Sequence, residues 1–258
     1  MRFTQAIVRP PSTNFAAGIA SAIGGGGPDV QVALTQHQQY CDALRDCGLQ
    51  LTRLAADFRH PDSTFIEDTA VLTARAAIVT RPGAPSRLQE SAATLESLRE
   101  LFGTICEIKA PGTVDGGDVC DVDDHFVIGL SARTNIEGAR QLTALLSDLG
   151  HKSRLVDIRG CKALLHLKSG LSYLGDGVCV VRADAPFLDA LNRYELITVS
   201  ISESYAANCI RVNDRVLVAA GYPELVATLV ERGHQVTALP MSEFRKMDGG
   251  LSCLSLRF

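Results

Sequence analysis

The sequence predicts one α/β domain over residues 1–258, a five-fold pseudo-symmetric α/β propeller of strand–turn–strand–helix repeats. Hairpin signals followed by helical stretches recur at about 40–50 residues, a spacing typical of propellers and arrays. The last residues also resemble a strand that can pair with one near the start, which would remove an exposed sheet edge. An ordinary α/β domain with short hairpins is the alternative.

Four repeats lie inside the chain, with the first turn near 74–75, and the turns of the other three are marked by Gly, Asn and Asp, residues that tolerate left-handed backbone. Helix ends are marked too, for example by Asn135 as a cap and Gly150 as a stop. The expected strand pairs and helices are 68–73 and 76–81 with 87–102; a strand that begins at 117–118 and turns at 123–124, paired with 125–129, with 135–149; 164–174 and 178–182 with a short helix opened by Pro186; and 208–212 and 215–219 with 223–232.

A fifth repeat needs both ends of the chain. Residues 250–257 supply one strand and residues 3–9 another, followed by a helix over 30–47 that Gly48 stops. The propeller is therefore expected to be closed by its N- and C-terminal strands.

Composition limits the class of protein. Hydrophobic residues make up 46% of the chain, which is ample for a core, and the formal net charge is −4 without a basic stripe. Nucleic acid is therefore not expected as a partner. No segment approaches the roughly 18 apolar residues of a membrane span, and the N-terminus does not resemble a signal peptide. A soluble, cytoplasmic protein is expected.

Eight cysteines occur without any CxxC spacing, which removes the main zinc-ribbon and thioredoxin signals. In a reducing compartment the default is free thiols, most of them small buried hydrophobic side chains. One of them has a context that suggests reactivity. Cys253 follows the glycine pair Gly249–Gly250, whose small size allows close backbone approach. An inert core thiol is the alternative.

Ionisable residues lie at equivalent places in several repeats. Glu67 and Asp68 begin the first repeat, Asp115 and Asp118 the second, and His166 the third, where it alternates with leucines and is expected on one face of a strand. Each has a structural alternative: a solvated Glu-Asp loop, Asp-Gly turn chemistry, or a satisfied core histidine. Together they would suit a cationic substrate, since unpaired buried charges are costly. The run 24–27 of four glycines lacks a phosphate-binding motif and is interpreted as a lid, part of a segment over 18–30.

Seven segments resemble, in order, the dimethylarginine dimethylaminohydrolases of the guanidino-modifying (pentein) superfamily. They are PDSTFIEDTAV (61–71), TRPGAPSR (80–87), PGTVDGGDV (111–119), SARTNIEG (131–138), LHLKSG (165–170), AANCI (206–210) and MDGGLSCLS (247–255). The resemblance implies hydrolysis of asymmetric dimethylarginine and monomethylarginine to citrulline and an amine, without metal or other cofactor. It leaves a homodimer open.

The resemblance also implies a role for each site residue. Cys253 corresponds to the nucleophile, His166 to the acid/base and Asp115 to the carboxylate that orients the histidine. The implied substrate contacts are Asp68 and Glu67 at the guanidinium, Arg87 and Arg133 at the α-carboxylate, and Asp62 at the α-amino group with main chain near Ile19 and Met247.

Related activities remain as alternatives. An arginine deiminase would use the same nucleophile and histidine, but that family is longer and has an acidic residue where this chain has Lys168. Agmatine deiminase would not need an arginine pair for a carboxylate. A non-enzymatic arginine-binding protein would not need Cys253 with His166.

Overall fold

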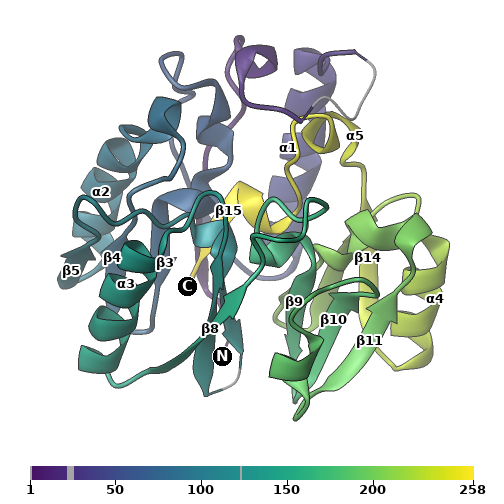
Figure 1. Cartoon of the computed structure of the whole chain (residues 1–258). Helices are drawn as coiled ribbons and strands as arrows, with labels where there is room; N and C mark the ends of the chain where they lie inside the picture. The colour runs from purple at the N-terminus through teal and green to yellow at the C-terminus, as the bar shows by residue number, and fades with distance from the viewer. Residues whose placement is uncertain (1, 22–25, 123) are drawn as a thin grey trace. The chain divides into compact units, whose positions relative to one another are not determined.

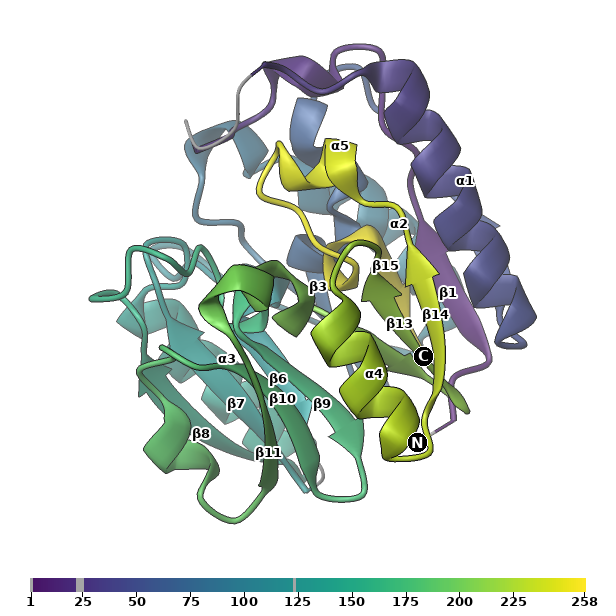
Figure 2. The same ribbon diagram turned by 90° about the vertical axis from the view of Figure 1, so that its right-hand side faces the viewer.

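The computed structural model describes residues 2–21, 26–122 and 124–258, and Figures 1 and 2 show its ribbon from two sides. Within these ranges, the strands form five three-stranded sheets. The middle strand of each sheet is antiparallel to one neighbour and parallel to the other. The sheets are β15–β1–β2 (Ser255–Arg257, Gln5–Val8, Gln50–Arg53), β3–β4–β5 (Ala70–Leu72, Ala76–Val79, Thr104–Glu107), β6–β7–β8 (Val119–Val122, His125–Leu130, Lys152–Asp157), β9–β10–β11 (Leu171–Gly175, Val178–Arg182, Glu195–Val199) and β12–β13–β14 (Ile210–Val212, Arg215–Ala219, Gln235–Leu239).

The helices begin and end near the predicted signals. Asn135 caps its helix by accepting a hydrogen bond from the backbone N–H of Gly138, and Gly48, Gly150 and Gly233 follow three helices with φ of 89°, 85° and 85°. Only glycine adopts that backbone without strain, so these predicted stops are confirmed. The α-helices are α1 (Val30–Asp46), α2 (Glu90–Leu101), α3 (Ile136–Asp148), α4 (Pro223–Glu231) and α5 (Ser242–Arg245).

The third strand of every sheet is a feature that the repeat pattern did not predict. β2, β5, β8, β11 and β14 each lie at a sheet edge, parallel to the middle strand. Their side chains are mostly exposed or half-buried. An edge strand with little burial shows no clear alternation of apolar residues, so the sequence carries only a weak signal for it.

A second difference concerns the start of each repeat. The first strands are shorter than predicted because a 3₁₀ turn precedes each of them. These turns are η3 (Ile66–Thr69), η5 (Gly116–Asp118), η6 (Leu167–Ser169), η8 (Ile201–Ala207) and η9 (Ser252–Leu254). The short helix expected at Pro186 is likewise a 3₁₀ turn, and it starts later, at Leu188.

The chain divides into two compact units. The first comprises Met1–Ile66 with Asn208–Phe258, and the second comprises Glu67–Ala207. In the first, β1 pairs with β15, so the predicted pairing of the two chain ends is confirmed. A single domain over residues 1–258 stays a prediction.

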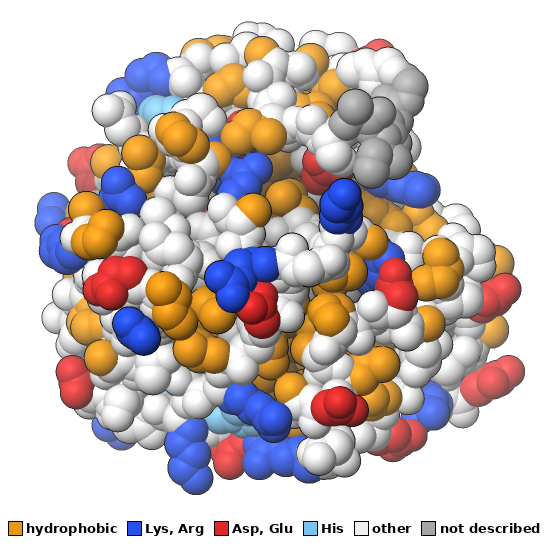
Figure 3. Space-filling view, in the orientation of Figure 1, with side chains coloured by type: hydrophobic (Ala, Val, Ile, Leu, Met, Phe, Trp, Pro, Cys, Tyr) orange, Lys and Arg blue, Asp and Glu red, His pale blue; other side chains and the backbone are white. Residues whose placement is uncertain are grey.

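Each unit has its own apolar packing. In the first unit the rings of Phe15, Phe65 and Phe244 pack with centroids 5.6–6.3 Å apart. In the second, α3 lies along its sheet (Figure 1). Leu142 and Leu146 of this helix are fully buried. On the face shown in Figure 3, Lys and Arg side chains are interspersed with Asp and Glu. Among the described residues, no helix is long and apolar enough to cross a membrane.

Candidate active site

The residues predicted for catalysis and for binding the guanidinium lie in 3₁₀ turns or at their N-caps rather than in strands. Glu67 and Asp68 belong to η3, Asp115 and His166 are the N-cap residues of η5 and η6, and Cys253 lies in η9. The prediction that His166 lies on one face of a strand is therefore wrong. Leu164 and Leu167 are buried, but they are held in a turn region, which over so few residues shows the same spacing of apolar side chains as a strand.

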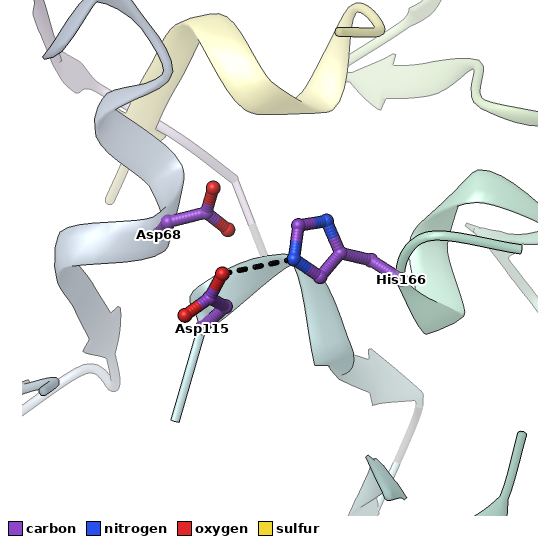
Figure 4. A group of neighbouring side chains, drawn as sticks. All are labelled: Asp68, Asp115 and His166. Atoms are coloured by element: carbon purple, nitrogen blue, oxygen red, sulfur yellow. Dashed lines mark hydrogen bonds and ion pairs between the residues drawn. The ribbon is translucent and has the colours of Figure 1, made fainter. Parts of the chain in front are cut away.

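His166 and Asp115 form the central contact of the second unit (Figure 4). Nε2 of His166 lies 3.0 Å from Oδ2 of Asp115. Oδ1 of the same carboxylate accepts a hydrogen bond from the backbone N–H of Gly83 at 2.7 Å, and Asp115 is completely buried. With both oxygens engaged, this carboxylate holds the imidazole ring in one orientation.

Asp68 lies beside this pair and is also buried. Its Oδ1 accepts from the backbone N–H of Gly117 at 2.8 Å, and its Oδ2 accepts from Nη1 of Arg87 at 2.6 Å. Burial works to raise the pKa of Asp68, but the positive charges of His166 and Arg87 hold it well below its usual range. Asp68 is therefore a carboxylate at neutral pH.

Two glycines allow these groups to approach one another. A Cβ on Gly116 would lie 2.0 Å from the carbonyl oxygen of Glu67. A Cβ on Gly117 would lie 2.9 Å from the His166 ring and 3.0 Å from Oδ1 of Asp68. The Asp-Gly-Gly-Asp segment over 115–118 thus depends on both glycines for close packing, beyond the needs of a turn.

His166 is charged in this environment. Burial works to lower its pKa, but the negative charges of Asp68 and Asp118 and the hydrogen bond with Asp115 outweigh burial and raise the pKa to about 9. A histidine that is protonated at neutral pH can donate a proton to a leaving amine, which suits the predicted acid/base role.

This pKa predicts how stability depends on pH. The folded form keeps its His166 proton up to a pKa of about 9, whereas an unfolded histidine loses it near 6.5. The stabilisation is fully present below pH 6.5 and is lost as pH rises through 9, by on the order of 3 kcal/mol. Chemical denaturation across this range should show the decline in wild type and a flatter profile in His166→Gln. Equal slopes in both proteins would contradict the assignment.

Glu67, the neighbour of Asp68, has a cationic partner of its own. Nζ of Lys168 lies 2.6 Å from Oε1 of Glu67, and both side chains are largely buried. Glu67 therefore pairs with Lys168, whereas its neighbour Asp68 pairs with Arg87.

The predicted arginine pair is placed as follows. Nε and Nη2 of Arg87 donate to the carboxylate of Glu90 at 2.8–3.1 Å, in addition to the contact of Arg87 with Asp68. Arg133 is half-buried, and a Cβ on Gly83 would lie 2.1 Å from its carbonyl oxygen. Arg87 thus joins Asp68 to Glu90, and the role of the two arginines in holding an α-carboxylate stays a prediction.

The first unit brings together the residues predicted to hold the α-amino group. The backbone N–H of Ile19 donates to both carboxylate oxygens of Asp62, at 3.0 and 3.2 Å. A Cβ on Gly18 would lie 2.4 Å from Oδ1 of Asp62 and 3.1 Å from Cε of Met247, so all three predicted residues are neighbours. Of the predicted lid, residues 22–25, which include two glycines of the run, lie outside the described residues.

Cys253 is half-buried in η9, and hydrogen bonds hold the turn around it. The backbone N–H of Gly250 lies 3.4 Å from its Sγ. The preceding residue, Ser252, donates through its backbone N–H to Oδ1 of Asn208 at 2.9 Å and accepts from Nδ2 of the same amide. Asn208 thereby fixes the turn that presents the thiol.

A cysteine–histidine contact away from the proposed site shows that such a pair is not by itself a site. In α1, Sγ of Cys41 lies 3.6 Å from Nδ1 of His37. Burial raises the pKa of Cys41 to about 11 and lowers that of His37 to about 3, so both are neutral at pH 7. All eight cysteines are free, and burial similarly raises the pKa of Cys120 and Cys179. The prediction of free and mostly buried thiols is confirmed.

Among the described residues, one group has the composition of a metal site. Ligand atoms of Asp68, Asp115 and His166 lie within 4.8 Å of one another. A metal needs a neutral imidazole, whereas His166 stays protonated to a pKa of about 9 and Asp68 already binds Arg87. These residues fit an ion-pair network better than a metal, and the expected absence of a cofactor stays a prediction.

The sequence assigned no role to several residues of this network. Asp118 was noticed only as a second carboxylate beside the glycines, and Glu90, Ser131 and Thr134 were not singled out. Serine, threonine and glutamate are common on surfaces, so their types alone carry no signal. The available signal was position: Ser131 and Thr134 flank Arg133 in SARTNIEG (131–138), one of the segments that resemble the family.

Comparison with known proteins decides the family. No family model matches the chain. A dimethylarginine dimethylaminohydrolase of Pseudomonas aeruginosa is 42% identical over 257 residues, covering 99% of this chain and all of that protein. One from Streptomyces coelicolor is 34% identical, covering 98% and 96%. The chain belongs to the dimethylarginine dimethylaminohydrolase family.

Solved structures agree with this fold. The Pseudomonas aeruginosa enzyme, as a cysteine-to-serine mutant complexed with citrulline, matches with a TM-score of 0.95 and 42% identity over the full length of both chains. A histidine-to-glycine variant in an adduct with S-methyl-L-thiocitrulline also gives 0.95, at 42% identity and 99% and 100% coverage. The N-terminal domain of ArgZ, a cyanobacterial arginine dihydrolase, matches at 0.88 with 19% identity, covering 100% and 97%. The predicted five-fold pentein fold is confirmed.

Proposed function

We propose that this chain hydrolyses Nω-methylated arginines to citrulline and dimethylamine or methylamine. The observation that carries the proposal is full-length similarity at 42% identity to a dimethylarginine dimethylaminohydrolase. The chemistry of the described residues supports it: a partly exposed thiol, a protonated histidine oriented by a carboxylate, and a buried ionised aspartate.

The reaction begins with a bond between Sγ of Cys253 and the guanidinium carbon. A thiolate is the strongest side-chain nucleophile near neutral pH, which matters because resonance makes guanidinium a poor electrophile. His166 then gives its proton to the methylated nitrogen, and the carbon–nitrogen bond breaks to release the amine. Since Nε2 of His166 is engaged by Asp115, this proton transfer falls to Nδ1.

The second half of the reaction restores the enzyme. The product of the first half is an S-alkylthiouronium on Cys253. His166, now neutral, takes a proton from water as the oxygen bonds to the same carbon, and the carbon–sulfur bond breaks to regenerate the thiolate. The atoms of water end in citrulline and on His166, so no redox partner is required.

Substrate recognition is divided among three groups. Asp68 and Glu67 bind the guanidinium, and Arg87 with Arg133 binds the α-carboxylate. Asp62 binds the α-amino group, with Ile19 and Met247 beside it. A cytoplasmic location and a homodimer complete the proposal.

Citrulline release from a substrate panel tests this function. Dimethylarginine and monomethylarginine should be turned over, whereas arginine and agmatine should be poor substrates. Faster turnover of arginine would favour an arginine deiminase. Binding of arginine without product from any compound would favour a non-enzymatic binding protein.

The arginine assignment gives a separate prediction. Arg133→Ala should lower kcat/KM for dimethylarginine by about 10- to 100-fold, because a charge-assisted contact with a carboxylate is worth roughly 1.5–3 kcal/mol. Agmatine, which has no carboxylate, should lose little. The exposed Arg140, changed to alanine, is the matched control. Equal losses for both substrates would show that Arg133 does not bind the carboxylate.

A further inference from the structure

Asp118 is a fully buried carboxylate to which the proposed reaction gives no role. It ends the turn η5 and accepts three hydrogen bonds. The backbone N–H of Leu167 donates to Oδ1 at 3.0 Å, and the hydroxyls of Ser131 and Thr134 donate to Oδ2 at 2.6 and 2.7 Å. The three donors come from two segments that are far apart in the sequence.

Each donor is tied directly to a residue of the proposed site. Leu167 follows His166 in the chain. Oγ of Ser131 accepts from the backbone N–H of Arg133 at 2.9 Å. Oγ1 of Thr134 accepts from the backbone N–H of Asp115 at 3.1 Å.

The hydrogen-bond directions require a carboxylate at the centre. The Ser131 hydroxyl accepts from the backbone N–H groups of Arg133 and Thr134, the latter at 3.0 Å. The Thr134 hydroxyl accepts from the backbone N–H of Asp115. Each hydroxyl therefore donates its single hydrogen to Asp118. The third donor is also an N–H. An ionised carboxylate accepts from all three, whereas an amide would place its NH₂ against a donor on one side.

The surrounding packing fixes this carboxylate in place. A Cβ on Gly129 would lie 3.3 Å from Oδ1 of Asp118 and 3.0 Å from Cβ of Leu167. The segment that carries His166 therefore rests closely on β7 at this glycine.

We propose that Asp118 is a positioning residue that holds His166, Asp115 and the Arg133 segment in register through these three hydrogen bonds. One buried carboxylate thereby couples the orientation of the acid/base pair to the binding of the substrate carboxylate. The inference rests on the proposed function, because the roles of Asp115, His166 and Arg133 belong to it.

Each of the three hydrogen bonds, together with the site residue that its donor adjoins or contacts, is called an arm, and variants that break one arm test the coupling. Ser131→Ala breaks the Arg133 arm and should raise KM for dimethylarginine roughly tenfold with a smaller change in kcat. Thr134→Val, nearly the same shape, breaks the Asp115 arm and should lower kcat roughly tenfold with little change in KM. Asp118→Asn should both raise KM and lower kcat. Its control is Asp57→Asn, another buried carboxylate that accepts from a backbone N–H and a histidine, for which unchanged kcat and KM are expected.

A role limited to stability would give a different result. All variants would then lower Tm and the active fraction, while KM and the pH profile of the folded enzyme stayed as in wild type, and the positioning role would be rejected. If Asp118→Asn unfolds, the kinetics of Ser131→Ala and Thr134→Val decide whether the positioning role holds.

A readout that does not need turnover separates this inference from the proposed function. Histidine NMR should show a lower pKa for His166 in Thr134→Val than in wild type. An unchanged pKa in this variant would overturn the Asp115 arm even if wild type released no citrulline. Absence of citrulline from wild type would instead overturn the function.

Discussion

Cys253→Ser is expected to lower kcat for dimethylarginine by on the order of 10⁴- to 10⁶-fold, the scale seen when a catalytic nucleophile is removed. The reason is the pKa: a serine hydroxyl ionises far less readily than a thiol, so the thiouronium intermediate cannot form at a useful rate. Substrate binding, measured by calorimetry, should remain near wild type because the groups proposed to bind substrate are unchanged.

Cys41→Ser is the matched control for this experiment. Cys41 contacts His37, and burial raises its thiol pKa to about 11. Its substitution should leave kcat and KM at wild-type values. Substantial activity in Cys253→Ser, or a comparable loss in Cys41→Ser, would remove Cys253 from the mechanism.

His166→Ala is expected to lower kcat by about 10²- to 10⁴-fold, the usual contribution of general acid/base catalysis. KM should change much less, because the proposed substrate contacts are made by other residues. The variant also leaves Asp115 without the imidazolium that it contacts and Asp68 without one of its two nearby cations, so its Tm and circular dichroism have to be measured beside the kinetics.

His234→Ala, a half-buried histidine outside the proposed site, serves as the control and should retain activity. If His166→Ala unfolds at the assay temperature, the more conservative His166→Gln separates folding from catalysis. A folded His166→Gln with wild-type kcat would show that the histidine is a core residue only.

The repeat architecture could be predicted because its signals are local. Glycine after α1, α3 and α4, and the cap Asn135, act within one turn of the backbone and can be identified from one sequence. Pairing of β1 with β15 was also predictable, since an unpaired terminal strand would leave a sheet edge exposed.

The edge strands and the 3₁₀ turns depended on tertiary context. A strand such as β2, whose residues are mostly exposed, gains its structure from its neighbour rather than from its own pattern. In the turn η3, Asp68 accepts a hydrogen bond from the backbone N–H of Gly117, a residue 49 positions away in the chain. No local propensity encodes such a contact.

The same limit applies to the site. The residue types and the family resemblance predicted Asp115, His166 and Asp68, which the structure brings together. They did not predict that Arg87 lies between Asp68 and Glu90. Nor did they predict that Asp118 accepts hydrogen bonds from Ser131, Thr134 and Leu167. Those contacts follow from side-chain packing between distant turns, and hydroxyl partners such as Thr134 have no distinctive sequence signal.

The covalent intermediate tests the central claim most directly. Wild-type protein would be mixed with dimethylarginine, quenched in acid within one turnover and digested for mass spectrometry. The account predicts that the peptide containing Cys253 gains the mass of the substrate less dimethylamine, and that the Cys41 peptide does not. Citrulline release with no adduct on Cys253 at any quench time, or an adduct on another residue, would contradict it.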